Sequence, residues 1–221
     1  MKKASQLLSV ITLMLIFAGC KKNSPGIEGV SFQLKASNNS TAVQAKTTAA
    51  SITWSSGTVT PSTVKFEAKK GTSEVEYTSA TSTQVNLFNI AQSTFGNISL
   101  PEGVYSEIEL KIAVNGTVPA PALELNGSYN NGTVNTPVVF RITTPVLIKA
   151  EKNNVDISGG AFVAVTDLNL SLYTTGITQT MLNSATQTGG SIIISSNSNA
   201  ALYNIIINNI SQFHHAEFNH K

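Results

Sequence analysis

Apolar and charged residues alternate through the middle of this chain, and this alternation constrains the fold more than any other feature of the sequence. Within residues 104–114, Ile108, Leu110 and Ile112 occupy every second position and alternate with two glutamates and a lysine at positions 107, 109 and 111. Because successive side chains of a strand point to opposite faces of a sheet, this segment has one apolar and one charged face. A strand of this kind favours an antiparallel sheet that is packed on one side over a parallel sheet that is buried on both sides.

Short runs with the same period recur along the chain and are separated by residues typical of turns. Residues 30–34 alternate in this way, and the two runs on either side of Lys69-Lys70-Gly71 predict a β-hairpin. Many short strands at this spacing predict a mainly β fold, an antiparallel β-sandwich of the immunoglobulin-like or transthyretin-like kind. Further strands are predicted within residues 52–54, 64–68, 75–77, 85–87, 123–125, 138–142, 146–150 and 162–173, and turns at residues 115–116, 126–127, 131–132, 153–154 and 159–160.

The pattern changes after Tyr173, where apolar residues begin to recur at helical spacing. Residues 177–185 have this spacing, residues 192–194 form one more apolar run, and Asn199 is suited to cap a helix that extends to Ile210. We therefore predict one or two short C-terminal helices that close one end or one face of the sandwich. Their apolar faces are interpreted as core packing and not as a ligand groove.

The first twenty residues have the layout of an export signal. Lys2 and Lys3 precede an apolar run over residues 7–17, which is shorter than the ~20 residues that span a bilayer as a helix. Small residues at positions 18 and 19 then lead to Cys20. This segment resembles the signal peptide and lipobox of a bacterial lipoprotein. The resemblance implies cleavage before Cys20 and attachment of acyl chains such as palmitate to its thiol and to the new amino group, and two or three such chains anchor a protein to a membrane almost permanently.

This resemblance and the turn residues divide the chain into four parts. Residues 1–19 are the expected signal peptide, and residues 20–29 are the lipidated cysteine and a polar tether. Residues 30–213 are expected to form a single β-sandwich domain with a helical C-terminal part, and residues 214–221 a tail that contains histidine. Residues 36–51 are rich in serine, threonine and alanine and predict a long loop. The body is long enough to bury a core as one domain, and two small domains are the alternative.

The cysteine and charge content argues against two classes of site. Cys20 is the only cysteine, and its lipidation leaves no thiol for a disulfide or a thiolate metal site. The chain has 14 Lys and Arg and 12 Asp and Glu, so removal of Lys2 and Lys3 with the signal makes basic and acidic residues equal in number. No nucleic-acid partner is expected from that balance. Charged residues are 12% of the chain, about half the usual share, and the polar residues in their place suit an exposed β surface.

A second resemblance rests on a turn and the two strands around it. Residues 84–90 followed by residues 98–110, with the turn Leu100-Pro101-Glu102-Gly103-Val104-Tyr105, resemble a motif of uncharacterised bacterial lipoproteins that have a β-sandwich body. In this turn Pro101 fixes φ, Gly103 permits an unusual backbone, and Tyr105 begins the next strand. The resemblance implies no known activity and no functional residues.

All three histidines lie in the last eight residues of the chain. His214, His215, Glu217 and His220 offer imidazole and carboxylate ligands that suit a zinc-like ion. However, neighbouring residues such as His214 and His215 diverge on a helix or a strand, and the order of the residues is not that of a His-Glu-x-x-His motif. We therefore expect a solvated tail, with a metal site as the weaker hypothesis, and no cofactor.

Catalytic patterns are weak throughout the chain, and no catalytic residue is predicted. No Gly-x-Ser-x-Gly motif occurs, so a serine nucleophile would have to take its base from the histidine tail. Glu107 and Glu109 share a face with Lys111, which indicates a solvated charged stripe and not a glycosidase pair. Asp156 lies in an oxygen-rich stretch that predicts an Asn/Asp turn, with a calcium loop as the weaker hypothesis. Asp167 is interpreted as an outward residue or a hydrogen-bond partner within the fold. An exported hydrolase is therefore the weakest functional hypothesis.

The aromatic residues are the basis of a sugar-binding hypothesis. Rings that face outward from a sheet can stack against the apolar face of a glycan, whereas single aromatic residues on strands usually belong to the core. The rings available for such a platform are those of Trp54, Tyr77, Tyr105, Tyr129, Tyr173 and Tyr203.

Together these patterns favour a membrane-anchored, non-catalytic binding or adhesion module at the cell envelope, with a glycan or a protein as its ligand. The alternative is a structural or assembly subunit, such as a pilus-like protein that gives or receives a strand at an open sheet edge. Lys21 and Lys22 after Cys20 favour the outer membrane as the location. Which side of that membrane the body occupies, and its oligomeric state, are left open by the sequence.

Overall fold

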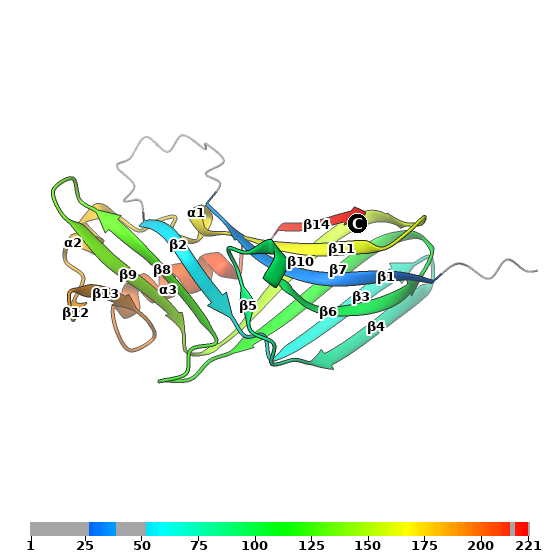
Figure 1. Ribbon diagram of the computed structural model, residues 1–221, viewed down its shortest axis with the longest axis horizontal. Helices are drawn as coiled ribbons and strands as arrows, with labels where there is room; N and C mark the ends of the chain where they lie inside the picture. Colours follow the sequence, from blue (N-terminus) through cyan, green and yellow to red (C-terminus); the bar gives the residue numbers. More distant parts are fainter. Residues whose placement is uncertain (1–26, 39–51, 213–214, 221) are drawn as a thin grey trace, which may run out of the picture.

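The computed structural model describes residues 27–38, 52–212 and 215–220, and this part of the chain is mainly β structure (Figure 1). Its strands form three sheets, each named below after one of its strands. The β1 sheet has the order β14 (His215–His220), β11 (Phe162–Asn169), β1 (Ile27–Ser37) and β6 (Thr94–Pro101). The β7 sheet has the order β10 (Pro145–Ile157), β7 (Gly103–Asn115), β3 (Thr63–Lys70) and β4 (Ser73–Ala80). The β8 sheet has the order β12 (Gln187–Thr188), β13 (Ser191–Ile194), β9 (Asn135–Ile142), β8 (Leu123–Asn130), β2 (Ile52–Val59) and β5 (Val85–Asn86).

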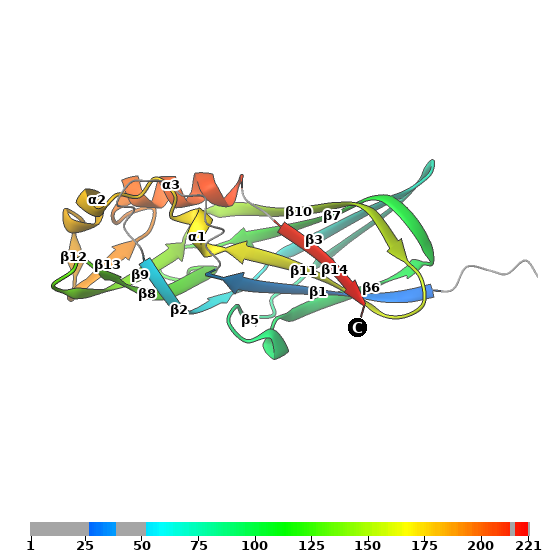
Figure 2. The same cartoon turned by 90° about the horizontal axis from the view of Figure 1, so that it is seen from above.

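Short helices complete the described part of the chain. They are α1 (Leu170–Tyr173), α2 (Gln179–Asn183) and α3 (Ala200–Ile210), with a 3-10 turn, η1 (Ile90–Gln92), before β6. Figure 2 shows α1, α2 and α3 together along one side of the molecule. α2 and α3 confirm the two predicted C-terminal helices, whereas α1 lies within a segment predicted as a strand. Among the described residues no helix has the length and apolar character needed to cross a membrane.

The β1 and β7 sheets pack face to face, so the predicted β-sandwich is confirmed. Phe32 of β1 stacks against Phe66 of β3 across the two layers, with ring centroids 5.5 Å apart. The alternation in residues 104–114 also has its predicted effect, because Ile108, Leu110 and Ile112 are fully buried on the inner face of β7. Burial of large apolar side chains of this kind stabilises the fold by about 2 kcal/mol each.

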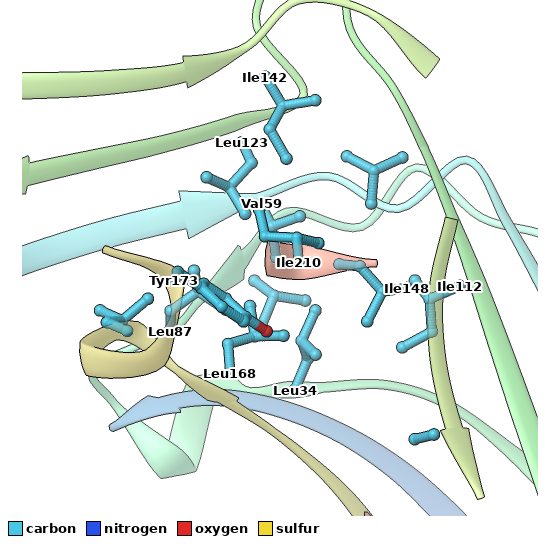
Figure 3. Packing of buried hydrophobic residues seen from close by; sticks show 14 of the residues in the cluster. Leu34, Val59, Leu87, Ile112, Leu123, Ile142, Ile148, Leu168, Tyr173 and Ile210 are labelled. Atoms are coloured by element: carbon cyan, nitrogen blue, oxygen red, sulfur yellow. The ribbon is translucent and has the colours of Figure 1, made fainter. Parts of the chain in front are cut away.

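The β8 sheet extends the core beyond the sandwich. Its inner face packs on α3, where the rings of Phe140 and Tyr203 have centroids 5.9 Å apart. Figure 3 shows the junction, where Leu123 and Ile142 of the β8 sheet lie near Ile210 of α3. Nearly all buried apolar residues of the described chain form one continuous cluster across all three sheets.

Most neighbouring strands are antiparallel, as predicted, but two pairs are parallel. β3 and β4 pair over their whole length, which confirms the hairpin at Lys69-Lys70-Gly71. The pairs β1 with β11 and β13 with β9 run parallel. Parallel strands need a crossover connection, and the long stretch of chain between β1 and β11 supplies one. The predicted turns that do lie between strands are those at residues 115–116, 131–132 and 159–160.

Two predicted turns are wrong, because the residues lie inside long strands. Asn126-Gly127 is part of β8, where a Cβ on Gly127 would lie 2.4 Å from the carbonyl oxygen of Thr53. Glycine therefore allows β2 to approach closely beside a register shift between these two strands. Asn153-Asn154 is part of β10, and Asn154 has a φ of 55° that disturbs the strand without ending it. Asn and Gly thus mark strand irregularities in these two places.

Several predicted boundaries also need correction. β1 begins at Ile27, so the end of the predicted tether (residues 20–29) belongs to the first strand. The strand predicted over residues 162–173 ends at Asn169, whose side-chain oxygen accepts a hydrogen bond from the backbone N–H of Leu172 and caps α1. Within the tail predicted over residues 214–221, residues 215–220 form β14. The signal peptide, Cys20 and most of the loop predicted over residues 36–51 lie outside the described residues.

Candidate ligand-binding cavity

A cavity of about 290 Å³ opens at one end of the β8 sheet. The loop between β7 and β8 forms one wall with Val118, Pro119 and Pro121. The end of β9 supplies Arg141, and the turn between β13 and α3 supplies several hydroxyl and amide groups. The cavity therefore combines an apolar wall with a polar wall, which is the usual composition of small-molecule sites.

Backbone hydrogen bonds fix the loop between β7 and β8. The N–H of Ala122 donates to the carbonyl oxygen of Ile142 at 3.0 Å, and the N–H of Thr117 donates to that of Ala120 at 2.9 Å. Gly116 is required at the start of the loop, because a Cβ there would lie 2.1 Å from the Ile142 carbonyl oxygen. The loop thus presents its proline residues to the cavity on a fixed backbone.

The opposite wall is a tight turn over residues 195–198. The backbone N–H of Ser195 donates to the carbonyl oxygen of Ser198 at 2.8 Å, and the reciprocal bond measures 3.2 Å. The buried Ser195 hydroxyl donates to Oδ1 of Asn197 at 2.7 Å. Because Oδ1 accepts this bond, the Nδ2 group of Asn197 remains as a hydrogen-bond donor at the cavity.

Asn199 begins α3 as predicted, but its side chain does not cap the helix. It adopts the left-handed region with a φ of 52°. Its Nδ2 donates to the carbonyl oxygens of Ile193 at 2.8 Å and Thr186 at 2.9 Å. Asn199 therefore ties the cavity turn to β13 and to the segment before β12, and its role is to position the wall.

Arg141 is the only arginine in the chain, and among the described residues it is the only charged one that lines the cavity. It lies directly opposite Glu124 in the pairing of β8 with β9, and its Nε donates to the Glu124 carboxylate at 2.8 Å. The side chains are 40% and 32% exposed, so this ion pair contributes little stability. With Nε engaged, the two terminal nitrogens of Arg141 are the donors that the cavity offers to a ligand.

Arg141 is not among the site residues predicted from the sequence, because it belongs to none of the motifs considered there. Two signals in the sequence do indicate it. A lone arginine in a lysine-containing chain suggests a planar, directional donor. The predicted turn at Asn131-Gly132 also sets the β8–β9 register, in which Glu124 and Arg141 are opposite each other.

The predicted aromatic platform is wrong for most of its members. The rings of Trp54, Tyr105, Tyr129, Tyr173 and Tyr203 are buried in the core. Several of the hydroxyl groups have internal partners, as in the bond from Tyr129 to the Asn183 side chain at 2.8 Å. Of the predicted set only Tyr77, on the edge strand β4, is exposed.

The stripe of charges predicted on β7 is not simply solvated, because Glu109 is only 7% exposed. Lys111 lies 2.8 Å from one of its carboxylate oxygens, and Lys149 pairs with the other. On β3, Glu67 lies between Lys111 and Lys65, at 2.8 and 2.6 Å. Hydrogen bonds from Lys111 and then Lys65 lower the pKa of Glu67 to about 2. The lysines and glutamates of this face, which we name the charge ladder, are engaged with one another.

Most side chains of the histidine tail that was considered as a metal site lie outside the described part of the chain. His214 and the side chains of His215 and His220 lie outside the described residues. Glu217 of β14 lies with its carboxylate 3.5 Å from Nζ of Lys35, so it pairs with a lysine. In the described ranges, His, Cys, Asp and Glu side chains do not gather in a group of three that could hold a metal ion.

The two aspartates considered as sites have structural surroundings. Asp156 lies within β10 and accepts a hydrogen bond from the Ser158 hydroxyl at 2.9 Å, so the predicted Asn/Asp turn is wrong. Asp167 of β11 is 12% exposed and lies 4.0 Å from Nζ of Lys35. Burial, and to a smaller degree the negative charge of Asp167, raises the pKa of the Tyr173 hydroxyl.

The turn over residues 100–105 has a structural explanation. The Tyr105 hydroxyl donates to the carbonyl oxygen of Pro101 at 2.7 Å and so closes the turn on itself. Gly103 has a φ of 142°, which confirms the need for glycine there. Nζ of Lys70 lies 5.8 Å from the centre of the Tyr105 ring and covers the turn. These contacts account for the motif without any ligand.

Comparison with protein-family models, with curated proteins and with solved structures finds no match to the chain.

Proposed function

We propose that this protein is a lipoprotein anchored at Cys20 in the cell envelope, most simply in the outer membrane, and that its body is a non-catalytic binding module. The cavity beside Arg141 is the single observation that supports a binding role. The described chain begins with β1 at one end of the molecule, while β12 and β13, next to the cavity, lie at the other (Figure 1). A lipid attached a few residues before β1 would therefore leave the cavity facing away from the membrane.

The chemistry of the walls favours a small uncharged sugar as the ligand. Arg141 and Asn197 supply directional hydrogen-bond donors, which match hydroxyl and carbonyl oxygens. Pro119 and Pro121 supply a flat apolar surface for the C–H face of a sugar ring. Glu124 already balances the charge of Arg141, so an uncharged ligand leaves no net charge in the complex.

The surroundings of the buried Ser195 hydroxyl in the cavity do not favour a catalytic role. Ser195 donates its proton to the side-chain oxygen of Asn197, and an amide cannot act as a general base. A hydrolase would need a base within reach of that oxygen.

A glycan array tests this proposal, with the chain from Gly26 onward as the probe. We expect saturable binding to a set of uncharged glycans that share a terminal sugar. Arg141→Leu should weaken the apparent affinity for these glycans at least tenfold, because two hydrogen-bond donors are lost. Lys152→Ala, an exposed substitution on β10, is the matched control and should bind as the unsubstituted protein does. Equal binding by the Arg141 variant would show that the ligand lies elsewhere.

A further inference from the structure

β4 is an exposed sheet edge that lacks most of the usual protection against pairing. Natural proteins protect edge strands with charged residues, above all lysine, and with proline, bulges or short length, and of these β4 has only the charges of Glu74 and Glu76. β4 pairs with β3 over all eight of its residues without a register shift, and it contains neither lysine nor proline. Its outward side therefore offers a regular row of backbone donors and acceptors.

The other outer strands of the described sheets are protected. β5 and β12 have two residues each. β10 carries Pro145, Lys149 and Lys152 and is distorted at Asn154. β6 ends at Pro101 and has a register shift against β1, and β14 lies against β10. β4 alone combines length, regularity and exposure.

Tyr77 adds an apolar contact at the centre of this edge. Its side chain comes from the inner face of the β7 sheet, yet it is 38% exposed because no strand follows β4. It stands at the rim of a small hollow between β4 and β6 that reaches the buried rings of Phe32 and Phe95. Figure 1 shows β4 along the outer rim of the molecule, on the half away from β12 and β13.

We propose that β4 pairs antiparallel with β4 of a second copy of this chain, with Tyr77 opposite Tyr77 at the two-fold axis. The two β7 sheets then form one continuous sheet, and the interface is closed because each copy uses the same strand. This inference goes beyond the proposed function, since the cavity at the far end is not involved.

The charge ladder is compatible with this register. Residues directly opposite one another on β10, β7, β3 and β4 form two rows across the β7 sheet. One row consists of Lys149, Lys111 and Lys65 and ends at Thr78 of β4. The other consists of Glu151, Glu109 and Glu67 and ends at Glu76 of β4. With Tyr77 at the axis, Thr78 lies opposite Glu76 of the second copy. The lysine row of one copy thus continues into the glutamate row of the other.

The neighbouring register is unfavourable. If Val75 occupied the axis, Glu74 would lie opposite Glu76 of the second copy, and like charges directly opposite each other destabilise a sheet. Thr78 at the boundary of the two rows is therefore the residue that makes the Tyr77-centred pairing electrostatically acceptable.

Cysteine cross-linking of the full-length chain tests the pairing. Residues directly opposite in an antiparallel pair have Cα atoms about 4.5–5.5 Å apart, which is within the range of a disulfide. We expect Tyr77→Cys to give a covalent dimer on oxidation. Lys152→Cys and the unsubstituted chain, which has Cys20 alone, should give none. A Tyr77→Cys protein that stays monomeric, with circular dichroism equal to that of the unsubstituted chain, would overturn the proposal.

Two matched substitutions at Thr78 test the register in the Tyr77→Cys background. Thr78→Glu places two pairs of like charges across the axis and should lower the dimer yield about tenfold. Thr78→Lys places lysine opposite glutamate and should retain the yield. Position 78 is exposed, so both variants should fold. Equal yields from the two variants would overturn the Tyr77-centred register.

Discussion

Glu109→Gln is the substitution that best tests how the charge ladder stabilises the sandwich. Glu109 forms ion pairs with Lys111 and Lys149, and its side chain is 7% exposed. Both lysines keep another partner in the variant, since Lys111 also pairs with Glu67 and Lys149 with Glu151. No charge is therefore left buried and unpaired, and the large penalty for breaking a buried ion pair does not apply.

The expected cost is the loss of two well-shielded ion pairs, about 1.5 kcal/mol in the free energy of unfolding. For a domain of this size that cost corresponds to a decrease of about 3–6 °C in Tm. Glu151→Gln is the matched control, because Glu151 is 41% exposed and forms one pair at 3.3 Å. It should cost less than about 0.5 kcal/mol.

Thermal unfolding followed by circular dichroism at neutral pH measures both variants, and urea unfolding gives the free energies. If the two substitutions had the same effect, burial would not strengthen the pairs of Glu109 and the reasoning would be refuted. A cost above about 4 kcal/mol would also refute it, because that is the range expected when a buried charge loses its only partner.

Three other substitutions test the ion pair of Glu67, the turn at Tyr105 and the lipid anchor at Cys20. The pKa of Glu67 is lowered from 4.5 to about 2, so its contribution to stability is complete above pH 4.5 and is lost as the pH falls towards 2. Glu67→Gln should therefore flatten the decrease of Tm between these pH values. An unchanged slope of Tm against pH would contradict this prediction. Tyr105→Phe removes the bond to the Pro101 carbonyl and should cost about 1 kcal/mol in urea unfolding, whereas Tyr77→Phe, at an exposed position, should cost almost nothing. Cys20→Ala should abolish labelling with radioactive palmitate and move the protein from the membrane to the soluble fraction; retention in the membrane would argue against the lipid anchor.

Local patterns predict those parts of the fold that depend on neighbouring residues. The period of two in residues 104–114 gives β7, and Lys69-Lys70-Gly71 gives the β3–β4 hairpin. The parallel pairing of β1 with β11 joins residues more than a hundred positions apart, and no local pattern encodes it. Asn126-Gly127 has the composition of a turn, yet it lies in a strand because β2 must approach closely there.

The candidate site is less predictable because its parts come from separate segments. Val118, Arg141 and Asn197 meet only after the β8 sheet and α3 have formed. The sequence also assigns Glu109 to a solvated face, since alternation shows which face a residue occupies but not how neighbouring lysines cover it. Likewise, aromatic composition does not distinguish a platform from a core, and here the core contains nearly all of the rings considered.

Nuclear magnetic resonance of the ¹⁵N-labelled body, titrated with the glycan that binds most strongly on the array, tests the central claim most directly. We expect saturable shifts of the backbone amides around residues 117–122, 141–143 and 195–198, and the loss of these shifts in Arg141→Leu. Shifts confined to other surfaces, such as β4 or the turn over residues 100–105, would contradict the claim that the cavity beside Arg141 is the binding site.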